Sequence, residues 1–192
     1  MVVTVFFVLL LASESSFAAP QYVSPKDPEH SSPAQVLSSG ELARLRPVVE
    51  RDLKEIVKRV YNEDAPTTAD LNDAFNECRV VKFNLGRLGE AVLVEGIGPP
   101  AVTMAMLNVY LRTKESYRLV MAGSGFGPYL IPGRDGIPYL MFGYTVGAGT
   151  EKLYRYHYSG NTKKYEVDAC DDHESKDLVC HGEHLPTFPD PY

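Results

Sequence analysis

The chain of 192 residues contains the stretch Gly89-Glu-Ala-Val-Leu-Val-Glu-Gly96-Ile97 and, 47 residues later, the similar stretch Gly136-Ile-Pro-Tyr-Leu-Met-Phe-Gly143-Tyr144. The two glycines that bound each stretch coincide, and so does the central leucine, Leu93 over Leu140. A constant offset between similar segments indicates an internal repeat. We therefore infer a duplication of about 47 residues in which each copy contributes three or four strands.

The residues around these stretches repeat as well. Tyr110 precedes Tyr117 by seven residues, and Tyr158 precedes Tyr165 by the same step at an offset of 48. Short runs rich in Val, Leu, Tyr and Phe alternate with Gly and Pro, a pattern typical of strands and turns. These runs cover 79–84, 90–95, 105–112, 117–122, 128–131, 138–145, 151–158 and 163–168.

Helical periodicity does not separate these runs, so the connections are predicted to be hairpins and the sheet mainly antiparallel. The sequence predicts a mainly β fold with an N-terminal helical segment (α+β). Its β-rich domain, 78–169, is expected to be an antiparallel meander of about eight strands built from two similar units. Those units are expected to pack as a small sandwich or as two blade-like sheets.

The segment 38–77 is predicted to be helical. Ser38 and Glu41 fit a capping box, and apolar residues recur at helical spacing as far as Val60. Pro47 either kinks one helix or follows a short turn over 41–46 and opens a second helix. Thr68 is expected to cap a further short helix over 69–76.

The N-terminal residues 1–18 are interpreted as a signal peptide. Residues 2–12 are apolar apart from Thr4, which is well short of the ~20 residues needed to cross a bilayer. Ser16-Phe17-Ala18 has small residues at the positions that a signal peptidase inspects. Met1-Val2-Val3-Thr4 lacks Lys and Arg, so either the true start lies upstream or the signal is atypical. The prediction is a secreted or periplasmic protein without a stable membrane anchor.

Two polar segments flank the predicted domain. The leader, 19–37, is rich in Pro, Ser, Asp and Glu and is expected to be flexible. The tail, 170–192, contains Cys170 and Cys180, which could close a short disulfide loop in an oxidising compartment. Cys78 then remains as a small buried side chain, although its pairing with either tail cysteine stays open. A zinc site in the tail is disfavoured because the Cys and His spacing matches no closed zinc module.

The loops before the two aligned stretches carry a resemblance to a known family. Asn84-Leu85-Gly86-Arg87-Leu88-Gly89-Glu90 and Arg134-Asp135-Gly136-Ile137-Pro138 occupy the place of an Asp-rich loop that leads into an apolar strand. Residues 79–169 thus resemble the FG-GAP and VCBS strand repeats of exported bacterial proteins. The resemblance implies a Ca²⁺ loop, but this chain keeps few of the oxygen ligands that Ca²⁺ needs, and no metal or cofactor is predicted.

No catalytic set is predicted. Ser124 stands in a glycine-rich turn without the frame of a nucleophile elbow. His157 is expected to share one face of its strand with Leu153 and Arg155. Tyr154, Tyr156 and Tyr158 fall on the other face, where they form either sheet core or an aromatic surface that binds a protein or a glycan.

The overall charge narrows the choice of partner. A formal net charge of −6 argues against nucleic acid, which requires clustered Lys and Arg. The predicted function is a non-enzymatic module that binds a protein or a glycan in the cell envelope or outside the cell. The alternative is a hydrolase, or an inhibitor of an envelope hydrolase.

Overall fold

The computed structural model describes residues 20–24, 30–61, 67–96, 106–133, 135–145, 151–168, 178–180 and 183–185. The helices are α1 (Pro33–Val36), α2 (Ser39–Tyr61) and α3 (Thr68–Glu77). The strands are β1 (Gln21–Tyr22), β2 (Arg79–Asn84), β3 (Glu90–Glu95), β4 (Met106–Arg112), β5 (Tyr117–Ser124), β6 (Phe126–Ile131), β7 (Tyr139–Thr145), β8 (Glu151–Ser159), β9 (Lys164–Asp168), β10 (Leu178–Cys180) and β11 (Glu183–Leu185). The predicted signal peptide lies outside the described residues.

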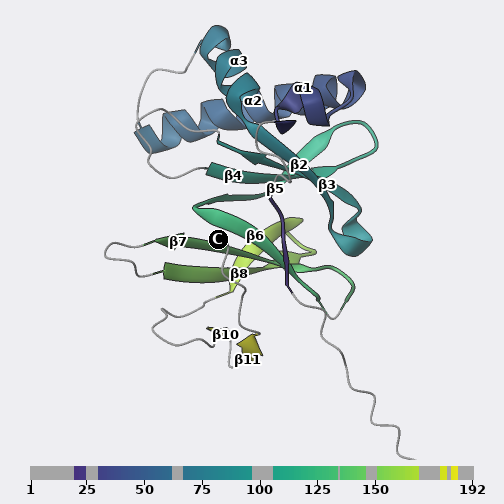
Figure 1. Ribbon diagram of the computed structural model, residues 1–192, viewed down its shortest axis with the longest axis vertical. Coiled ribbons are helices and arrows are strands. Elements are labelled where there is room, and N and C mark those ends of the chain that lie inside the picture. Colours follow the sequence, from purple (N-terminus) through teal and green to yellow (C-terminus); the bar gives the residue numbers. More distant parts are fainter. Residues whose placement is uncertain are drawn as a thin grey trace, which may run out of the picture.

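The strands form two stacked sheets beneath a layer of helices (Figure 1). The first sheet has the strand order β2-β3-β4-β5, and the second sheet has the order β1-β6-β7-β8-β9. All pairs within them are antiparallel, and β10 pairs with β11 separately. The mainly β fold with an N-terminal helical segment is confirmed, and the two sheets pack as a sandwich.

Helix α2 begins at the predicted capping box. The Ser38 N–H donates to Glu41 Oε2 at 2.9 Å, and the Glu41 N–H donates to Ser38 Oγ at 3.4 Å. Pro47 lies inside α2 without dividing it, so the alternative of two separate helices is wrong. Leu45 and Val49 are fully buried against the first sheet, and this packing holds the helix together across the proline.

The N-terminal ends of the other two helices differ from the sequence predictions. Helix α3 is capped by Thr67, whose hydroxyl accepts the Asp70 N–H at 3.2 Å, and not by Thr68. Thr67 is the better cap because Asp70, three residues later, completes the reciprocal hydrogen bond to its backbone N–H. The segment expected to be a flexible leader contains both β1 and α1. Val23 is buried in the cluster between the sheets, which accounts for the position of β1.

Three clusters of buried side chains follow the layers. The cluster between the helices and the first sheet contains Leu37, Leu45, Val48, Val49, Leu53, Leu71, Phe75, Cys78, Val80, Val92, Val94, Tyr110 and Tyr117. The cluster between the two sheets contains Val23, Leu85, Ala91, Leu93, Leu107, Val109, Leu111, Val120, Met121, Leu140, Phe142 and Tyr165. A smaller cluster on the outer face of the second sheet contains Tyr129, Ile131 and Met141. Each sheet therefore has buried side chains on both faces.

The two aligned stretches occupy equivalent places in the two sheets. Leu93 and Leu140 are both buried in the cluster between the sheets. The Gly89 N–H donates to the Gly86 carbonyl at 3.0 Å, and the Gly136 N–H donates to the Gly133 carbonyl at 3.3 Å, so the turns share a hydrogen bond at the offset of 47. Both sheets run through four consecutive antiparallel strands. That they arose by duplication stays a prediction.

The tyrosine steps at the offset of 48 do not correspond in space. Tyr110 pairs with Leu119, whereas Tyr158 pairs with Tyr165. Tyr110 lies in the cluster beneath the helices, and Tyr158 packs against the cluster between the sheets. A shift of one residue along a strand moves a side chain to the opposite face, and the offset of 48 is such a shift.

Candidate functional site

The tyrosines predicted to bind a partner face the space between the two sheets. Tyr154 pairs with Phe142 across β7 and β8, and Tyr156 and Tyr158 pack against the cluster between the sheets. The Tyr158 hydroxyl accepts a hydrogen bond from Arg118 Nη2 of the first sheet at 3.1 Å. All three side chains are half-buried. The structure therefore places them as sheet core more than as an open aromatic surface.

The opposite face of β8 carries Leu153, Arg155 and His157, as the alternation predicts. The Arg155 guanidinium lies 4.9 Å from the centre of the Tyr139 ring. His157 lines a hollow of about 190 Å³ together with Asp135. Within the described ranges, no three His, Cys, Asp or Glu side chains come together as metal ligands.

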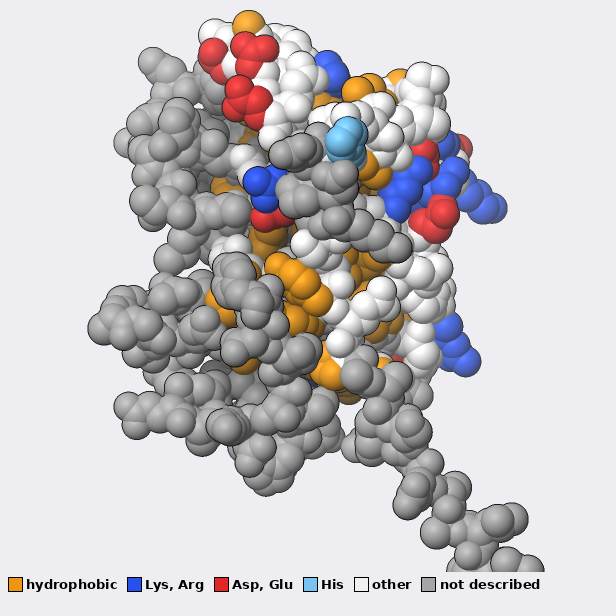
Figure 2. All heavy atoms as spheres, in the orientation of Figure 1, with side chains coloured by type: hydrophobic (Ala, Val, Ile, Leu, Met, Phe, Trp, Pro, Cys, Tyr) orange, Lys and Arg blue, Asp and Glu red, His pale blue; other side chains and the backbone are white. Residues whose placement is uncertain are grey.

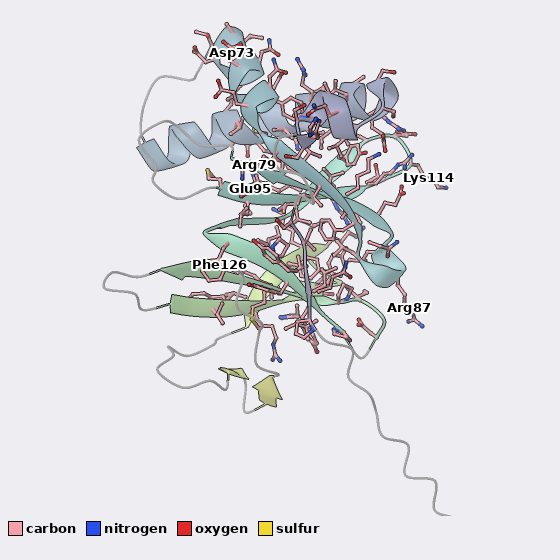
Figure 3. The ribbon with its side chains drawn as sticks, viewed as in Figure 1. Asp73, Arg79, Arg87, Glu95, Lys114 and Phe126 are labelled. Atoms are coloured by element: carbon pink, nitrogen blue, oxygen red, sulfur yellow. The ribbon has the colours of Figure 1, made fainter. Side chains whose placement is uncertain are left out.

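The oxygen atoms of the loops that resemble calcium sites take part in hydrogen bonds within the chain. Asn84 Oδ1 accepts the Gly86 N–H at 2.7 Å, and Asp135 Oδ1 accepts the Ile137 N–H at 3.0 Å. The Glu90 carboxylate forms an ion pair with Arg112. Arg87 projects outward from the first loop (Figure 3). The residues present thus act as turn and surface contacts.

The cysteine predictions fall mostly on residues outside the description. Cys170 and the side chain of Cys180 are not described. The predicted disulfide and the disfavoured zinc site therefore lie outside the described residues. Cys78 is a buried free thiol that donates to the Ala74 carbonyl at 3.1 Å. Burial raises the pKa of this thiol to about 12, with a smaller contribution from Glu77. Cys78 is therefore an unreactive core residue.

A groove of about 400 Å³ runs between the edges of the two sheets. Residues 21–24 of the β1 region form one wall, and 80–83 of β2 form the other, with His30, Ser31 and Val36 towards the helices. Successive side chains of a strand point to opposite faces, so four consecutive residues can line a groove only along the edge of their strand. The groove therefore follows the outer edge of β2.

The two sides of the sandwich differ in how the sheets meet. At one side β5 lies against β9, and Arg118 connects β5 to β8. At the other side β1 and β2 are the edge strands, and the groove separates them. Figure 2 shows hydrophobic side chains exposed between the helical layer and the second sheet on this face. The groove thus lies between the two edge strands on the side away from the contact between β5 and β9.

The outward backbone groups of β2 lie along this groove. The Val80 N–H donates to the Ser31 carbonyl at 2.7 Å, so the polar groups of Val80 point away from β3. Alternate residues of an antiparallel strand direct their N–H and C=O to the same edge. Lys82 therefore presents both groups to the groove, and among the described residues no backbone group bonds to them.

The side chain of Lys82 is held away from the strand edge. Its Nζ lies 2.9 Å from Glu41 Oε1 and 2.8 Å from Oε2, at the first turn of α2. The hydrogen bond from Lys82, followed by those from Ser38, lowers the pKa of Glu41 to about 2. This ion pair neutralises the lysine and fixes the helix layer to β2.

A second feature, which the sequence reasoning missed, is a buried polar cluster of Asp52, Asn108 and Tyr110 beneath α2. Asn108 and Tyr110 are fully buried on β4. Asp52 Oδ2, both polar atoms of the Asn108 amide and the Tyr110 hydroxyl lack hydrogen-bond partners among the described residues. Burial raises the pKa of Asp52 and, together with the nearby Asp52 charge, that of Tyr110. The amide within the apolar run of β4 was the available sequence signal.

Comparisons of the chain with protein-family models, with curated proteins and with solved structures found no match. None of the helices in the described part of the chain is both long enough and apolar enough to cross a membrane. The functional argument therefore rests on the groove and on its chemistry.

Proposed function

We propose that this chain is an exported, non-enzymatic binding protein and that the groove between β1 and β2 is its binding site for a protein or a glycan. The observation that carries the proposal is the groove of about 400 Å³, whose two walls come from the edges of different sheets. Its lining mixes apolar, aromatic and hydrogen-bonding side chains, as ligand sites commonly do. Tyr22 is 39% exposed at the wall and stacks on Tyr129, which supports its ring for contact with a ligand.

The groove can be tested by filling it. Gln21 lines the groove and also a neighbouring hollow of about 420 Å³, so Gln21→Trp places a bulky ring at the wall. Asn161→Trp adds the same ring at an exposed turn between β8 and β9 and serves as the matched control. The chain would be screened against a glycan array and a phage-displayed heptapeptide library, and the best ligand titrated against each variant.

We expect Gln21→Trp to weaken binding of the selected ligand at least tenfold and Asn161→Trp to leave it unchanged. Equal binding to both variants would show that the groove is not the site. Conversion of an arrayed glycan by the purified chain, lost in His157→Ala, would instead favour the alternative of a hydrolase.

The export part of the proposal has a separate test. Small residues at Ser16 and Ala18 predict cleavage after Ala18, so the mature chain begins at Ala19. N-terminal sequencing of the protein recovered outside the cytoplasm checks this. A mature chain that still began with Met1 would contradict it.

A further inference from the structure

Asp52 is a buried carboxyl group that the proposed binding site does not use. Its side chain is 8% exposed, and α2 brings it close to Tyr110 of β4. Asp52 Oδ1 accepts hydrogen bonds from Arg51 Nε at 3.1 Å and Nη2 at 2.9 Å, whereas Oδ2 has no partner among the described residues. A buried charge is costly unless it is fully hydrogen-bonded, so this environment suits an ionised carboxylate poorly.

The polar groups of β4 beneath Asp52 include a vacant acceptor. Asn108 and Tyr110 are two residues apart and share one face of β4, where their strand neighbours Val94 and Val92 belong to the cluster beneath the helices. Asn108 Oδ1 and the Tyr110 hydroxyl are fully buried and have no hydrogen-bond partner in the described part of the chain. An ionised carboxylate can only accept, whereas the neutral acid carries an O–H that can donate to such a group.

We infer that Asp52 is a proton-binding site that fastens α2 to β4. The neutral carboxylic acid, protonated from solvent, donates a hydrogen bond to Asn108 Oδ1. Release of the proton to solvent breaks this bond and leaves a buried charge. Helix α2 is therefore held on the first sheet more tightly in acid than at neutral pH, whatever ligand the groove binds.

The groups nearest to Asp52 act on its proton in both directions. Burial is the strongest influence and raises the pKa of Asp52 above the ordinary value of 3.8. The negative charge of Glu55 adds to this effect, whereas Arg51 and Lys164 of β9 oppose it. Tyr110 stays uncharged because burial raises its pKa as well. The net balance among these groups favours the neutral acid.

The other described elements around α2 bring few ionisable groups towards this carboxyl. Helix α1 contains none, and α3 has exposed acidic side chains at Asp70, Asp73 and Glu77. From β5, Tyr117 has a pKa raised by burial, and Arg118 donates to Tyr158 of the second sheet. Arg112 at the end of β4 forms an ion pair with Glu90. The proton on Asp52 is therefore governed by burial and by the nearest charges.

The first experiment removes the charge and keeps a donor. Asp52→Asn is uncharged at every pH, and its amide can donate as the protonated acid does. Asp73→Asn makes the same change on the exposed surface of α3 and is the matched control (Figure 3). Urea denaturation between pH 7 and pH 3 gives the equilibrium constant of unfolding for each protein. All of them keep the ion pair between Glu41 and Lys82, so its pH dependence cancels in the comparison.

A raised pKa in the folded protein stabilises the fold below the unfolded pKa, and this stabilisation is lost as the pH rises through the folded pKa. The unfolding constant of Asp52→Asn should therefore be about tenfold smaller than that of the wild-type protein at pH 7, and within about twofold of it at pH 3. Asp73→Asn should stay within about twofold throughout. A ratio that did not change with pH, or a wild-type protein more stable than Asp52→Asn at pH 7, would overturn the inference.

The hydrogen bond to Asn108 is tested by a double-mutant cycle. Asp52→Leu is also uncharged but has no donor, and Asn108→Leu removes the acceptor. The ratio of the unfolding constants of Asp52→Leu and Asp52→Asn should be about tenfold larger with Asn108 present than in the Asn108→Leu background. The same ratio in both backgrounds would show that no bond joins the two side chains, and the fastening of α2 to β4 would be wrong.

A further measurement needs no substitution and no unfolding. The carbon NMR signal of the Asp52 carboxyl group in the folded protein should titrate with a midpoint above 3.8, the ordinary value for aspartate. The side-chain amide signals of Asn108 should shift with the same midpoint, because the bond forms when the proton binds. A midpoint at or below 3.8 would show that the cluster favours the ionised carboxylate, which contradicts the inference.

Discussion

The two sheets of this protein each contain four consecutive antiparallel strands but differ in what lies on their outer faces. Helices α2 and α3 cover the first sheet and bury a large apolar cluster against it. The second sheet carries a smaller cluster on its outer face, where Arg155 lies over Tyr139, and Figure 1 shows the helices on the opposite side of the sandwich. The two sheets therefore differ in the burial of their outer faces, because helices pack on the first sheet alone among the described elements. The first sheet has the larger buried cluster on its outer face, and the groove beside its edge strand β2 is the proposed binding site.

The largest expected effect contrasts two leucines. One is packed between α2 and the first sheet, and the other lies on the outer face of the second sheet. Leu45→Ala removes a fully buried side chain beneath α2 and should lower the free energy of unfolding by about 3 kcal/mol. Leu153→Ala changes a partly buried side chain on the second sheet and should cost about 1 kcal/mol. Urea denaturation of both variants measures the difference. Equal losses would mean that the outer face of the second sheet is packed as tightly as that of the first.

The next effect concerns the contact between corresponding turns. Gly86 has a φ of +61°, and a Cβ there would collide with the Gly136 carbonyl oxygen. Gly89 has a φ of +96°, but a Cβ there would meet nothing within 4 Å. Gly86→Ala should therefore cost about 2 to 3 kcal/mol, and Gly89→Ala about 1 to 2 kcal/mol from backbone strain alone. Thermal denaturation should rank them in that order, and the reverse ranking would show that the turns do not press on each other.

A stabilising change is expected beneath α2. Asn108 buries an amide on the helix-covered face of the first sheet, and no described residue forms a hydrogen bond with it. Asn108→Leu replaces it with an apolar group of similar size and should raise the free energy of unfolding by about 1 kcal/mol. Asn161→Leu, at the exposed turn between β8 and β9, is the control and should change stability by less than about 0.5 kcal/mol. A destabilised Asn108→Leu protein would indicate that the amide is satisfied in solution.

The smallest effect is the pH dependence of the ion pair that connects α2 to β2. Glu41 has a pKa of about 2 in the folded protein, against an ordinary value of 4.5, so the unfolded chain binds more protons at acid pH. The ion pair stabilises the protein fully above pH 4.5, and this contribution declines as the pH falls towards about 2. Because Lys82 is partly exposed, the contribution should be about 1 kcal/mol.

Glu41→Gln provides the measurement of that contribution. The stability difference between the wild-type protein and Glu41→Gln should shrink as the pH is lowered from 6 to about 3, because only the wild-type carboxylate is linked to protons. Urea denaturation at several pH values would follow it. A difference that stayed constant with pH would place the stabilising role of Glu41 in its neutral hydrogen bonds to Ser38.

Much of the secondary structure could be predicted because its signals are local. The predicted strands 79–84 and 90–95 have the same bounds as β2 and β3, and the capping box at Ser38 marks the start of α2. The elements β1 and α1 were missed because two and four residues are too short to show a periodicity. The tyrosine row was identified correctly as one face of β8, but alternation cannot tell which face of a sheet meets another sheet.

The sequence by itself determined the mainly β class of fold, the alternation of buried and exposed positions and the antiparallel succession of the strands from residue 79 onward, because each depends on neighbours a few residues apart. Only the tertiary structure decided which strand edge lies beside the groove, where Asp52, Asn108 and Tyr110 meet, and which face of the second sheet the tyrosines occupy. These features depend on contacts between distant segments, such as Ser31 with Val80 and Glu41 with Lys82. Local patterns carry no information about such contacts, because the hydrogen-bonding groups of an edge strand are chemically the same as those of a central one.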